Sequence, residues 1–474
     1  MTRNTSDKAY QACINPDCGQ TFGINEVLFG CPKCGALLDV EYEWDRLAVP
    51  RSMEYFEHRW STKGIRAEGR LDFSGVWRFR ELLPFAPNEA LVTIGEGRTL
   101  LEQNTPLARE VGMKPDCLFL QYEGLNPSGS FKDNGMAAAF TLARLLGRKR
   151  VACASTGNTS ASLAMFAHKT DPPMLGIVFI GTGKIAYGKL SQALDYGAMT
   201  LQIEGDFDAC LRRVRQVADK LGIYLMNSMN PFRLEGQKAI MYRVLEALDW
   251  EVPDWIIAPG GNLGNCSAFG KAWRELHQLG LIKRIPRLAV IVATGANTLY
   301  HVTQKDRVTW NGGRYNQAKI SGLYAAMDES HYLPHTVASA IEIARPVNLP
   351  KALRALEIMN GVVREVTDEE ILEHKALVGR YGFGCEPASA ASVAGLRHLL
   401  REQIISPDER VVCILTGHEL NDPDATVKYH TGIDMKAVTP PPPTPPTGVV
   451  ANPPKKVADD LEAICAALGE RLPE

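Results

Sequence analysis

Four cysteines near the N-terminus are spaced in two pairs. Cys13 and Cys18 flank four residues, Cys31 and Cys34 flank two, and twelve residues separate the pairs. A glycine follows the second cysteine of each pair and permits the tight turn of a metal-binding knuckle. Four thiolates at this spacing are typical of a tetrahedral structural zinc site, although the spacing within the first pair is wider than usual. The alternative is four core cysteines that bind no metal. We therefore predict a zinc-ribbon-like module at residues 1–45, which is too small to fold without a bound metal ion.

A second candidate for chemistry is Lys132. It follows the turn Asn-Pro-Ser-Gly-Ser-Phe at residues 126–131 and stands at the opening of a predicted helix over residues 131–146. The positive end of a helix disfavours protonation of an amine, which would help Lys132 to act as a nucleophile or a base. Taken alone, this segment is equally compatible with an ordinary surface lysine in a first helical turn.

Two further loops carry small, hydrogen-bonding residues between a predicted strand and a predicted helix. Residues 155–160 offer hydroxyls, an amide and backbone N–H groups, which suit a carboxylate. Residues 259–265 contain glycines that let backbone amides close around a phosphate, but they lack the Gly-Lys-Ser/Thr of a nucleotide P-loop and the Gly-x-Gly-x-x-Gly of dinucleotide folds. Three such loops in one chain are much stronger evidence for a ligand site than any one alone.

These loops require a scaffold that brings the ends of several strands together. From about residue 76 to residue 435, short apolar runs rich in β-formers alternate with longer helix-like stretches. Examples are residues 117–121 with 131–146, 151–154 with 160–168, and 255–258 with 266–279. This alternation predicts an α/β architecture with parallel sheets, in which ligands bind at the carboxyl ends of strands and the amino ends of helices.

The C-terminal end has a different composition. Residues 439–447 read Thr-Pro-Pro-Pro-Pro-Thr-Pro-Pro-Thr, which favours an extended conformation and predicts a Pro-rich linker at residues 438–456. Residues 457–474 then form a predicted helical tail with apolar residues on one face. We expect this tail to dock on the body, with a partner protein as the alternative.

The overall composition is that of an ordinary globular protein. The 474 residues are 45% hydrophobic and 22% charged, and 52 basic residues against 54 acidic residues leave a formal net charge of −2. This balance argues against a surface built for nucleic acid. No run of apolar residues is long enough for a membrane span, and the first residues do not resemble a secretory signal. We therefore expect a cytoplasmic protein without nucleic-acid or membrane partners.

Together these segments resemble the threonine synthases, a family of fold-type II pyridoxal phosphate-dependent enzymes (tryptophan synthase β-like). The resemblance extends from about residue 75 to residue 424. It includes the stretches Glu123-Gly-Leu-Asn-Pro-Ser-Gly-Ser-Phe-Lys-Asp133, Ala154-Ser-Thr-Gly-Asn-Thr-Ser160, Met226-Asn-Ser-Met-Asn-Pro-Phe-Arg-Leu-Glu-Gly-Gln-Lys238, Cys385-Glu-Pro-Ala-Ser-Ala-Ala391 and Leu415-Thr-Gly-His418. The stretch that ends at Lys238 is the one most particular to threonine synthases, whereas the first two are shared across fold-type II relatives.

The resemblance implies a fold, a cofactor and an assembly. The fold would consist of two doubly wound α/β domains in a catalytic body at residues 46–437, with a smaller mobile subdomain at about residues 135–225 inserted within the larger one. The cofactor would be pyridoxal 5′-phosphate, in addition to the structural zinc. Because homodimers are common in this family, we also expect a homodimer.

The family motifs assign a role to particular residues. By the resemblance, Lys132 would carry the cofactor, Asn158 would contact its 3′-oxygen and Thr416 would face its pyridine nitrogen. The residues that would hold the cofactor phosphate are Gly261, Asn262, Leu263, Gly264 and Asn265. Those that would bind the substrate are Ser155, Thr156 and Thr159 for the carboxylate, and Asn227, Ser228 and Arg233 for the phosphate.

The implied activity is that of a carbon–oxygen lyase acting on phosphates. O-phospho-L-homoserine and water would become L-threonine and phosphate, by γ-elimination and β-addition, in the last step of threonine biosynthesis. A cysteate synthase acting on O-phospho-L-serine and a serine/threonine dehydratase are alternatives of the same fold, although Asn227, Ser228 and Arg233 favour a phosphorylated substrate. A non-catalytic scaffold is a further alternative, against which the intact Lys132 and phosphate loop argue.

The sequence departs from the family pattern at several positions. Asn134 stands where the family usually has arginine, and it could alter either local packing or substrate preference. Ser128 replaces the commoner threonine. The family's Thr-Pro-Leu element fits residues 98–101 and residues 104–107 about equally. We expect Cys385 to be a buried small residue and His418 to be a structural neighbour rather than a base.

Overall fold

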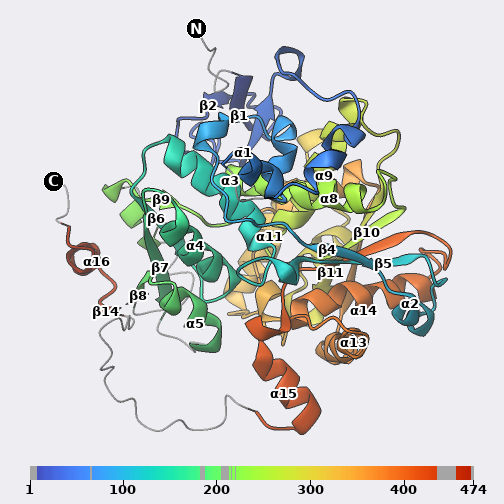
Figure 1. Cartoon of the computed structure of the whole chain (residues 1–474). Helices are drawn as coiled ribbons and strands as arrows, with labels where there is room; N and C mark the ends of the chain where they lie inside the picture. The colour runs from blue at the N-terminus through green and yellow to red at the C-terminus, as the bar shows by residue number, and fades with distance from the viewer. Residues whose placement is uncertain are drawn as a thin grey trace.

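The computed structural model describes residues 8–63, 67–181, 187–203, 213–214, 216–218, 220–434 and 455–470. The strands of these residues form three sheets, which Figure 1 shows with the helices around them. The helices are α1 (Ala67–Phe73), α2 (Thr105–Val111), α3 (Lys132–Leu145), α4 (Asn158–Lys169), α5 (Tyr187–Asp195), α7 (Pro231–Gln237), α8 (Ala239–Ala247), α9 (Gly264–Gln278), α10 (Thr298–Tyr300), α11 (Gln317–Glu329), α12 (Leu349–Ile358), α13 (Asp368–Arg380), α14 (Pro387–Arg401), α15 (Pro423–Thr431) and α16 (Leu461–Ala467). The Pro-rich run predicted at residues 439–447 lies outside the described residues.

The largest sheet has six strands. Their order is β12 (Val362–Val366), β11 (Arg287–Ala293), β10 (Trp255–Pro259), β13 (Val411–Leu415), β5 (Leu118–Tyr122) and β4 (Leu100–Gln103). Neighbouring strands are parallel except for β4, which pairs antiparallel with β5. All five residues of β10 and all five of β13 are buried, as expected of central parallel strands that helices cover on both faces.

The side chains of β10 show how this sheet separates two layers of helices. Trp255 and Ile257 belong to one hydrophobic cluster, together with residues of α2, α13 and α14. Ile256 and Ala258 belong to another, together with residues of α3, α7, α8, α9 and α12. This alternation follows from the two-residue period of a strand. The predicted α/β architecture with parallel sheets is confirmed.

A second sheet has five strands, all parallel. Their order is β14 (Lys455–Val457), β8 (Met199–Ile203), β7 (Leu175–Gly181), β6 (Arg150–Ala154) and β9 (Tyr224–Leu225). The four strands β6 to β9 come, in the chain, between β5 and β10 of the large sheet. β14 is a strand that the sequence did not suggest, at the junction of the predicted linker and the predicted tail.

The third sheet is small and lies near the N-terminus, at the top of Figure 1. It is antiparallel, in the order β2 (Thr21–Gly23), β1 (Ala9–Cys13) and β3 (Leu38–Tyr42). β3 is buried at four of its five residues because it also packs against α7 of the body. In the described part of the chain, no helix is long and apolar enough to span a membrane.

Candidate active site

Lys132 is the first residue of α3, and the loop before it is tied to the end of β13. The Phe131 N–H donates to the Thr416 carbonyl at 2.9 Å, and the His418 N–H donates to the Gly129 carbonyl at 2.8 Å. Gly129 has a φ of +78°, which a residue with a side chain rarely adopts. The Lys132 Nζ atom lies 3.8 Å from the centroid of the Phe131 ring. The turn therefore delivers the lysine to the edge at which the strands of the large sheet end.

The surroundings of Lys132 make its amine easy to deprotonate. Burial and, to a smaller extent, the positive charge of Arg233 lower the pKa of Lys132, the carboxylate of Glu386 acts in the opposite direction, and the net result is a pKa of about 7. Close to neutral pH, a large share of the amine is consequently uncharged. An uncharged amine can attack a carbonyl carbon or accept a proton, so the sequence-based expectation of a nucleophile or base has a physical basis here.

A pocket opens beside Lys132 and gathers many of the predicted site residues. Those among its lining residues are Lys132, Ser228, Arg233, Gly261, Asn262, Leu263, Gly264, Asn265 and Thr416. The structure thus brings together the predicted lysine, the predicted cofactor-phosphate loop and part of the predicted substrate-phosphate site. Asn158, Ser155, Thr156, Thr159 and Asn227 are not among the described residues that line this pocket.

The loop from Pro259 to Leu263 packs closely against its protein neighbours at its two glycines. A Cβ atom on Gly261 would lie 3.0 Å from the Ile341 Cα atom, and one on Gly260 would lie 2.8 Å from a methyl carbon of Val290. Leu263 adopts a left-handed φ of 62°, and α9 begins at the next residue. The amino end of α9 therefore points its free N–H groups at the pocket, an arrangement that favours a phosphate or another anion.

Arg233 supplies positive charge to the same pocket. Its side chain is 2% exposed, and its Nη1 atom donates to the Met226 carbonyl at 2.7 Å. Its Nε atom is buried without a hydrogen-bond partner, and no carboxylate of the described residues pairs with its guanidinium. Burial lowers the pKa of Arg233 to about 10, which still leaves it charged at neutral pH. A buried cation without a counter-ion is a strong indication of an anionic ligand.

The two helices that carry these cations are in backbone contact. A Cβ atom on Gly236 of α7 would lie only 2.0 Å from the carbonyl oxygen of Asn134 in α3. A Cβ atom on Gly135 of α3 would lie 2.9 Å from the carbonyl oxygen of Arg233 in α7. These two glycines allow α3 and α7 to approach closely, so Lys132 and Arg233 sit on one compact helix pair.

The loop between β6 and α4 is linked to the pocket by a hydrogen bond from Asn158 to Glu386, which lines the pocket. The Asn158 Nδ2 atom donates to Glu386 Oε2 at 2.9 Å. Ser155 Oγ accepts the Gly157 N–H at 3.2 Å, which shapes the turn that opens α4. The Asn227 amide is bonded to both the N–H and the carbonyl of Ala154, each at 3.1 Å, and so links the end of β9 to the end of β6. The binding roles predicted for Ser155, Thr156, Thr159 and Asn227 stay predictions.

Glu386 is a site residue to which sequence reasoning assigned no role. It is 4% exposed, it precedes α14, and its carboxylate accepts hydrogen bonds from Asn158 and from the Thr416 hydroxyl, the latter at 3.2 Å. A Cβ atom on Gly417 would lie 2.7 Å from its Oε1 atom, so the neighbouring glycine makes room for this carboxylate. A signal was present in the sequence, because a glutamate directly before a proline at a helix start lies inside the motif 385–391.

The structure explains the unusual Asn134. The Asn134 amide donates to Glu123 Oε2 at 2.8 Å and accepts from Arg243 Nη1 at 2.9 Å, and Arg243 pairs with Glu123 at 2.5 Å. A guanidinium from α8 therefore neutralises Glu123 beside Asn134. Of the two interpretations left open by the sequence, Asn134 has a clear packing role.

Three smaller expectations concern neighbouring residues. The first candidate Thr-Pro-Leu element, residues 98–101, runs into β4. The second, residues 104–107, is the start of α2, where Asn104 caps the helix by accepting the Leu107 N–H at 3.0 Å. Cys385 is fully buried and burial raises the pKa of its thiol to about 12, as expected of a packing residue. His418 accepts the Leu420 N–H at 3.1 Å and stacks on Tyr122, which fits a structural neighbour.

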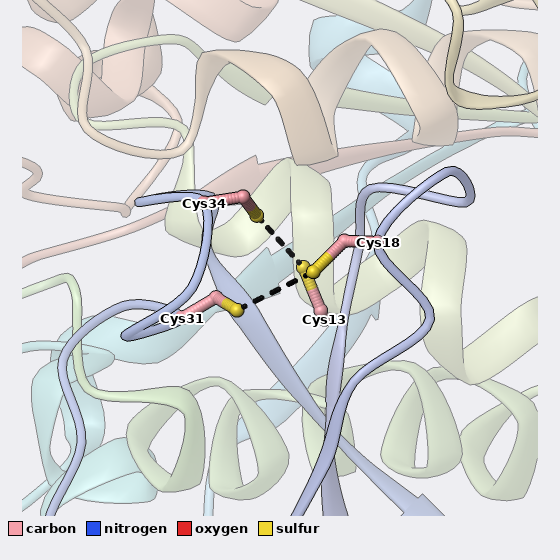
Figure 2. Close-up of side chains that lie close together, drawn as sticks. All are labelled: Cys13, Cys18, Cys31 and Cys34. Atoms are coloured by element: carbon pink, nitrogen blue, oxygen red, sulfur yellow. Dashed lines mark hydrogen bonds between the residues drawn. The ribbon is translucent and has the colours of Figure 1, made fainter.

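The four predicted zinc ligands also come together. Figure 2 shows their side chains converging from the end of β1 and the two following turns. The Sγ atoms of Cys13 and Cys34 are 3.5 Å apart, those of Cys18 and Cys31 are 3.7 Å apart, and all four lie within 4.8 Å of one another. Burial acts to raise the pKa of Cys31, but the N–H groups of Cys34 and Lys33 oppose this and lower it to about 7.

Comparisons with known proteins agree with this geometry. A family described as "Pyridoxal-phosphate dependent enzyme" matches residues 92–417. A threonine synthase of Methanocaldococcus jannaschii is 42% identical over 420 residues, which are 88% of this chain and 94% of the relative. A threonine synthase of Methanosarcina acetivorans is 42% identical over 416 residues, which are 88% of this chain and 93% of the relative.

A solved structure of a threonine synthase from yeast has the same fold. It superposes with a TM-score of 0.62 at 17% identity, over 98% of this chain and 99% of the yeast chain. The fold-type II architecture expected from the sequence is thereby confirmed. The chain belongs to the threonine synthase family of pyridoxal phosphate-dependent enzymes.

Proposed function

We propose that this chain converts O-phospho-L-homoserine and water into L-threonine and phosphate, with pyridoxal 5′-phosphate as its cofactor. One observation carries the proposal: Lys132, whose pKa is lowered to about 7, shares a pocket with Arg233, a buried cation without a carboxylate partner among the described residues. An amine that can exchange protons and a separate anion site are the two groups that this reaction requires. Membership of the threonine synthase family gives the proposal its substrate.

The pocket suits pyridoxal phosphate at both ends. At one end, the N–H groups of residues 261–265 and the amino end of α9 would hold the phosphate. At the other end, Asn158 and Thr416 would contact the ring, and the shared carboxylate of Glu386 fixes the orientation of both side chains. The bound cofactor would withdraw electrons from the α-carbon of the substrate.

The residues of the chain would perform the remaining steps. Lys132 would remove the α-proton and then a β-proton, after which phosphate leaves from the γ-carbon. A proton would then be delivered to the γ-carbon, water would add to the β-carbon, and a proton would return to the α-carbon. Arg233 and Ser228 would hold the substrate phosphate and stabilise the charge that develops on it as it leaves. Ser155, Thr156 and Thr159 would receive the substrate carboxylate at the start of α4.

The test compares three reactions of the purified protein. We expect phosphate and threonine from O-phospho-L-homoserine, little product from O-phospho-L-serine with sulfite, and little ammonia from L-serine or L-threonine. The assignment is wrong if O-phospho-L-homoserine is inert while one of the other substrates reacts. Lys132→Ala should abolish turnover, and Arg233→Gln should lower kcat/KM by about 10- to 100-fold, since a charge-assisted hydrogen bond contributes roughly 1.5–3 kcal/mol.

We further propose that the four cysteines bind a structural zinc ion. Four sulfurs at a Zn–S distance of about 2.3 Å in a tetrahedron are roughly 3.8 Å from one another, close to the 3.5 Å and 3.7 Å separations found here. Glycines at 19 and 35, with φ of 59° and 74°, form the turns beside two of the cysteines.

We also propose that the protein acts in the cytoplasm as a homodimer and has no nucleic-acid partner. The module at residues 1–45 and the mobile subdomain at about residues 135–225 would be separate units.

A further inference from the structure

A second pocket lies away from the Lys132 site. It has a volume of about 610 Å³ and is bounded by residues near Trp60, by the segment from Thr93 to Arg98 and by Lys169 at the last position of α4. The described residues that line the two pockets do not overlap. Asn158 is the first residue of α4 and Lys169 its last, so about 18 Å of helix separates this pocket from the Asn158 end.

All charged side chains among the described residues that line this pocket are basic. Its described lining includes Lys63, Arg70, Arg98 and Lys169 but no aspartate or glutamate. No carboxylate of the described residues lies within ion-pair distance of these four side chains. The hydroxyl-bearing side chains of Ser61, Thr62 and Thr93 complete the polar lining. A chain with a formal net charge of −2 thus concentrates four unpaired cations around one cavity.

Arg98 is held in place by two aromatic rings. Its Cζ atom lies 4.3 Å from the centroid of the Phe73 ring and 4.5 Å from that of Trp60, and its Nη1 atom donates to the Trp60 carbonyl at 2.9 Å. This sandwich fixes the guanidinium before any ligand arrives. The guanidinium of Arg78 also lies over the Trp60 ring, with its Cζ atom 4.5 Å from the ring centroid.

The aromatic residues are consequently engaged by arginines rather than free to stack on a ligand. A ligand would be recognised by charge and hydrogen bonds, for which fixed guanidinium and ammonium groups favour phosphate oxygens. Burial is the main factor that lowers the pKa of Arg78 to about 10, and its ion pair with Glu246 acts in the opposite direction. The nearby charges of Arg243 and Arg98 add to the effect of burial on this pKa. An anion in the pocket would relieve this repulsion between cations.

We propose that this pocket is a second ligand site, which binds a small phosphate-bearing anion. The anion would be held by Arg70, Arg98 and Lys169, and so would connect the segment before β4 to the carboxyl end of α4. The proposal is independent of the reaction at Lys132, because it rests on residues that line only this pocket. Its volume of about 610 Å³ lies in the range of small-molecule sites.

The experiment is a calorimetric titration of the purified, cofactor-loaded protein with pyrophosphate. Phosphate groups also bind at the Lys132 site under the proposed function, so the Arg233→Gln variant serves as the background in which the second site is measured. In that background we expect binding to persist and to weaken at least tenfold in both Arg70→Gln and Lys169→Gln. Both substituted side chains are exposed, so the fold should be retained, and the melting temperature checks this.

A matched control separates a site from a diffuse surface potential. Lys114 is an exposed lysine elsewhere on the surface, in an exposed ion pair with Asp408 at 3.7 Å, and Lys114→Gln should leave pyrophosphate binding unchanged. Equal weakening by Lys114→Gln, or the absence of binding in the Arg233→Gln background, would overturn the proposal. A titration with inorganic phosphate then shows whether one phosphate group is enough for binding, and a titration with AMP shows whether the site accepts a nucleoside. If acetate bound as tightly as pyrophosphate, phosphate would be rejected as the recognised group.

Discussion

Both ends of the chain return to the catalytic body, but different forces hold them there. The N-terminal module is attached through β3, whose carboxylates pair with basic residues of the body. Asp39 is 4% exposed and pairs with Lys351 at 2.8 Å and with Arg354. Glu41 pairs with Arg274 at 2.8 Å. The Asp39–Lys351 pair is buried, whereas the Glu41 and Arg274 side chains are 25% and 23% exposed. The geometry of the buried pair has to be satisfied for the module to dock.

A second buried cluster lies beside Tyr42, at the end of β3. The Tyr42 hydroxyl donates to Glu235 Oε2 at 2.6 Å. Glu235 and Glu275 share Lys238 and Lys271 in four ion pairs of 2.5–2.8 Å, and all four side chains are at most 3% exposed. A closed network of this kind adds little net stability, but it raises the free energy of any arrangement in which the module is displaced on the body.

The C-terminal tail is held by weaker and more local contacts. β14 adds a parallel strand to the edge of β8, and Ile464 of α16 belongs to the adjoining apolar cluster. Cys465 of the same helix is also buried. Its ion pairs, Arg150 with Glu470 and Arg213 with Asp459, are partly exposed. Figure 1 shows β14 and α16 at the side of the molecule, beside β8. The comparison indicates that buried charge fixes the module in one position, whereas apolar contact and strand pairing attach the tail.

The largest effect should come from loss of the metal at the module. Cys18→Ser removes one of four thiolates, and apparent binding free energies of structural zinc are on the order of 10 kcal/mol. We expect the variant to lose stoichiometric zinc and to become sensitive to proteases between residues 13 and 35, as measured by elemental analysis and limited proteolysis. Cys117→Ser, at a partly exposed thiol outside the cluster, is the control. A zinc-free parent protein that resists proteolysis equally well would contradict the proposal.

The next largest effect should follow from Asp39→Asn. The change leaves Lys351, which is 1% exposed, without its carboxylate, and breaking a buried pair in this way costs about 3–5 kcal/mol. The melting temperature should fall accordingly. The matched control is Asp17→Asn, because the Asp17–Arg314 pair is largely exposed and contributes at most about 1 kcal/mol. Equal melting temperatures for the two variants would show that the buried pairs do not hold the module.

The same residue predicts a pH dependence. Burial acts to raise the pKa of Asp39, but Arg354 and Lys351 outweigh it and hold the pKa well below the usual range. A carboxyl group with a depressed pKa stabilises the fold above its unfolded pKa of about 3.9, and this contribution is lost as the pH falls toward the folded value. The difference in melting temperature between the parent and Asp39→Asn should thus be constant above about pH 5 and shrink below pH 4. A difference that grows as the pH falls would contradict the assignment.

At the tail, Ile464→Ala should have an intermediate effect. Ile464 is 0% exposed, and truncating a buried isoleucine to alanine costs about 2–5 kcal/mol. Since the tail is attached locally, we expect it to undock without global unfolding, which hydrogen exchange at the β8 amides would detect. Glu462→Ala, on the exposed face of the same helix, should leave that exchange unchanged. Unaltered protection of β8 in Ile464→Ala would mean that strand pairing alone holds the tail.

The smallest effect is expected from Arg150→Gln. The Arg150 and Glu470 side chains are 28% and 41% exposed, and an exposed pair contributes at most about 1 kcal/mol. Hydrogen exchange at β8 should therefore change much less than in Ile464→Ala. If Arg150→Gln released the tail as fully as Ile464→Ala, charge would matter at both ends of the chain, and the contrast between them would disappear.

The sequence predicted those parts of the site that depend on local pattern. Lys132 and the loop at residues 259–265 were found because small residues between a strand and a helix are visible in the chain itself. The role of Arg243 could not be predicted, because it meets Asn134 from 109 positions further along the chain. Asp39 could not be identified as a buried anchor either, since its partners lie more than 300 residues away. β14 has only three residues, two of them lysines, and so carries no strand signal.

The close contact between α3 and α7 has a consequence for substrate choice. Gly236 packs on the backbone of Asn134, and Gly135 packs on that of Arg233, so the backbones of the two helices are in direct contact. Because Lys132 and Arg233 belong to these two helices and line the same pocket, we expect the distance between their side chains to select the length of the substrate. O-phospho-L-homoserine has one methylene more than O-phospho-L-serine between its α-carbon and its phosphate. A given distance between the Lys132 amine and the Arg233 guanidinium would suit only one of these lengths, and the phosphate of the other substrate would lie away from Arg233.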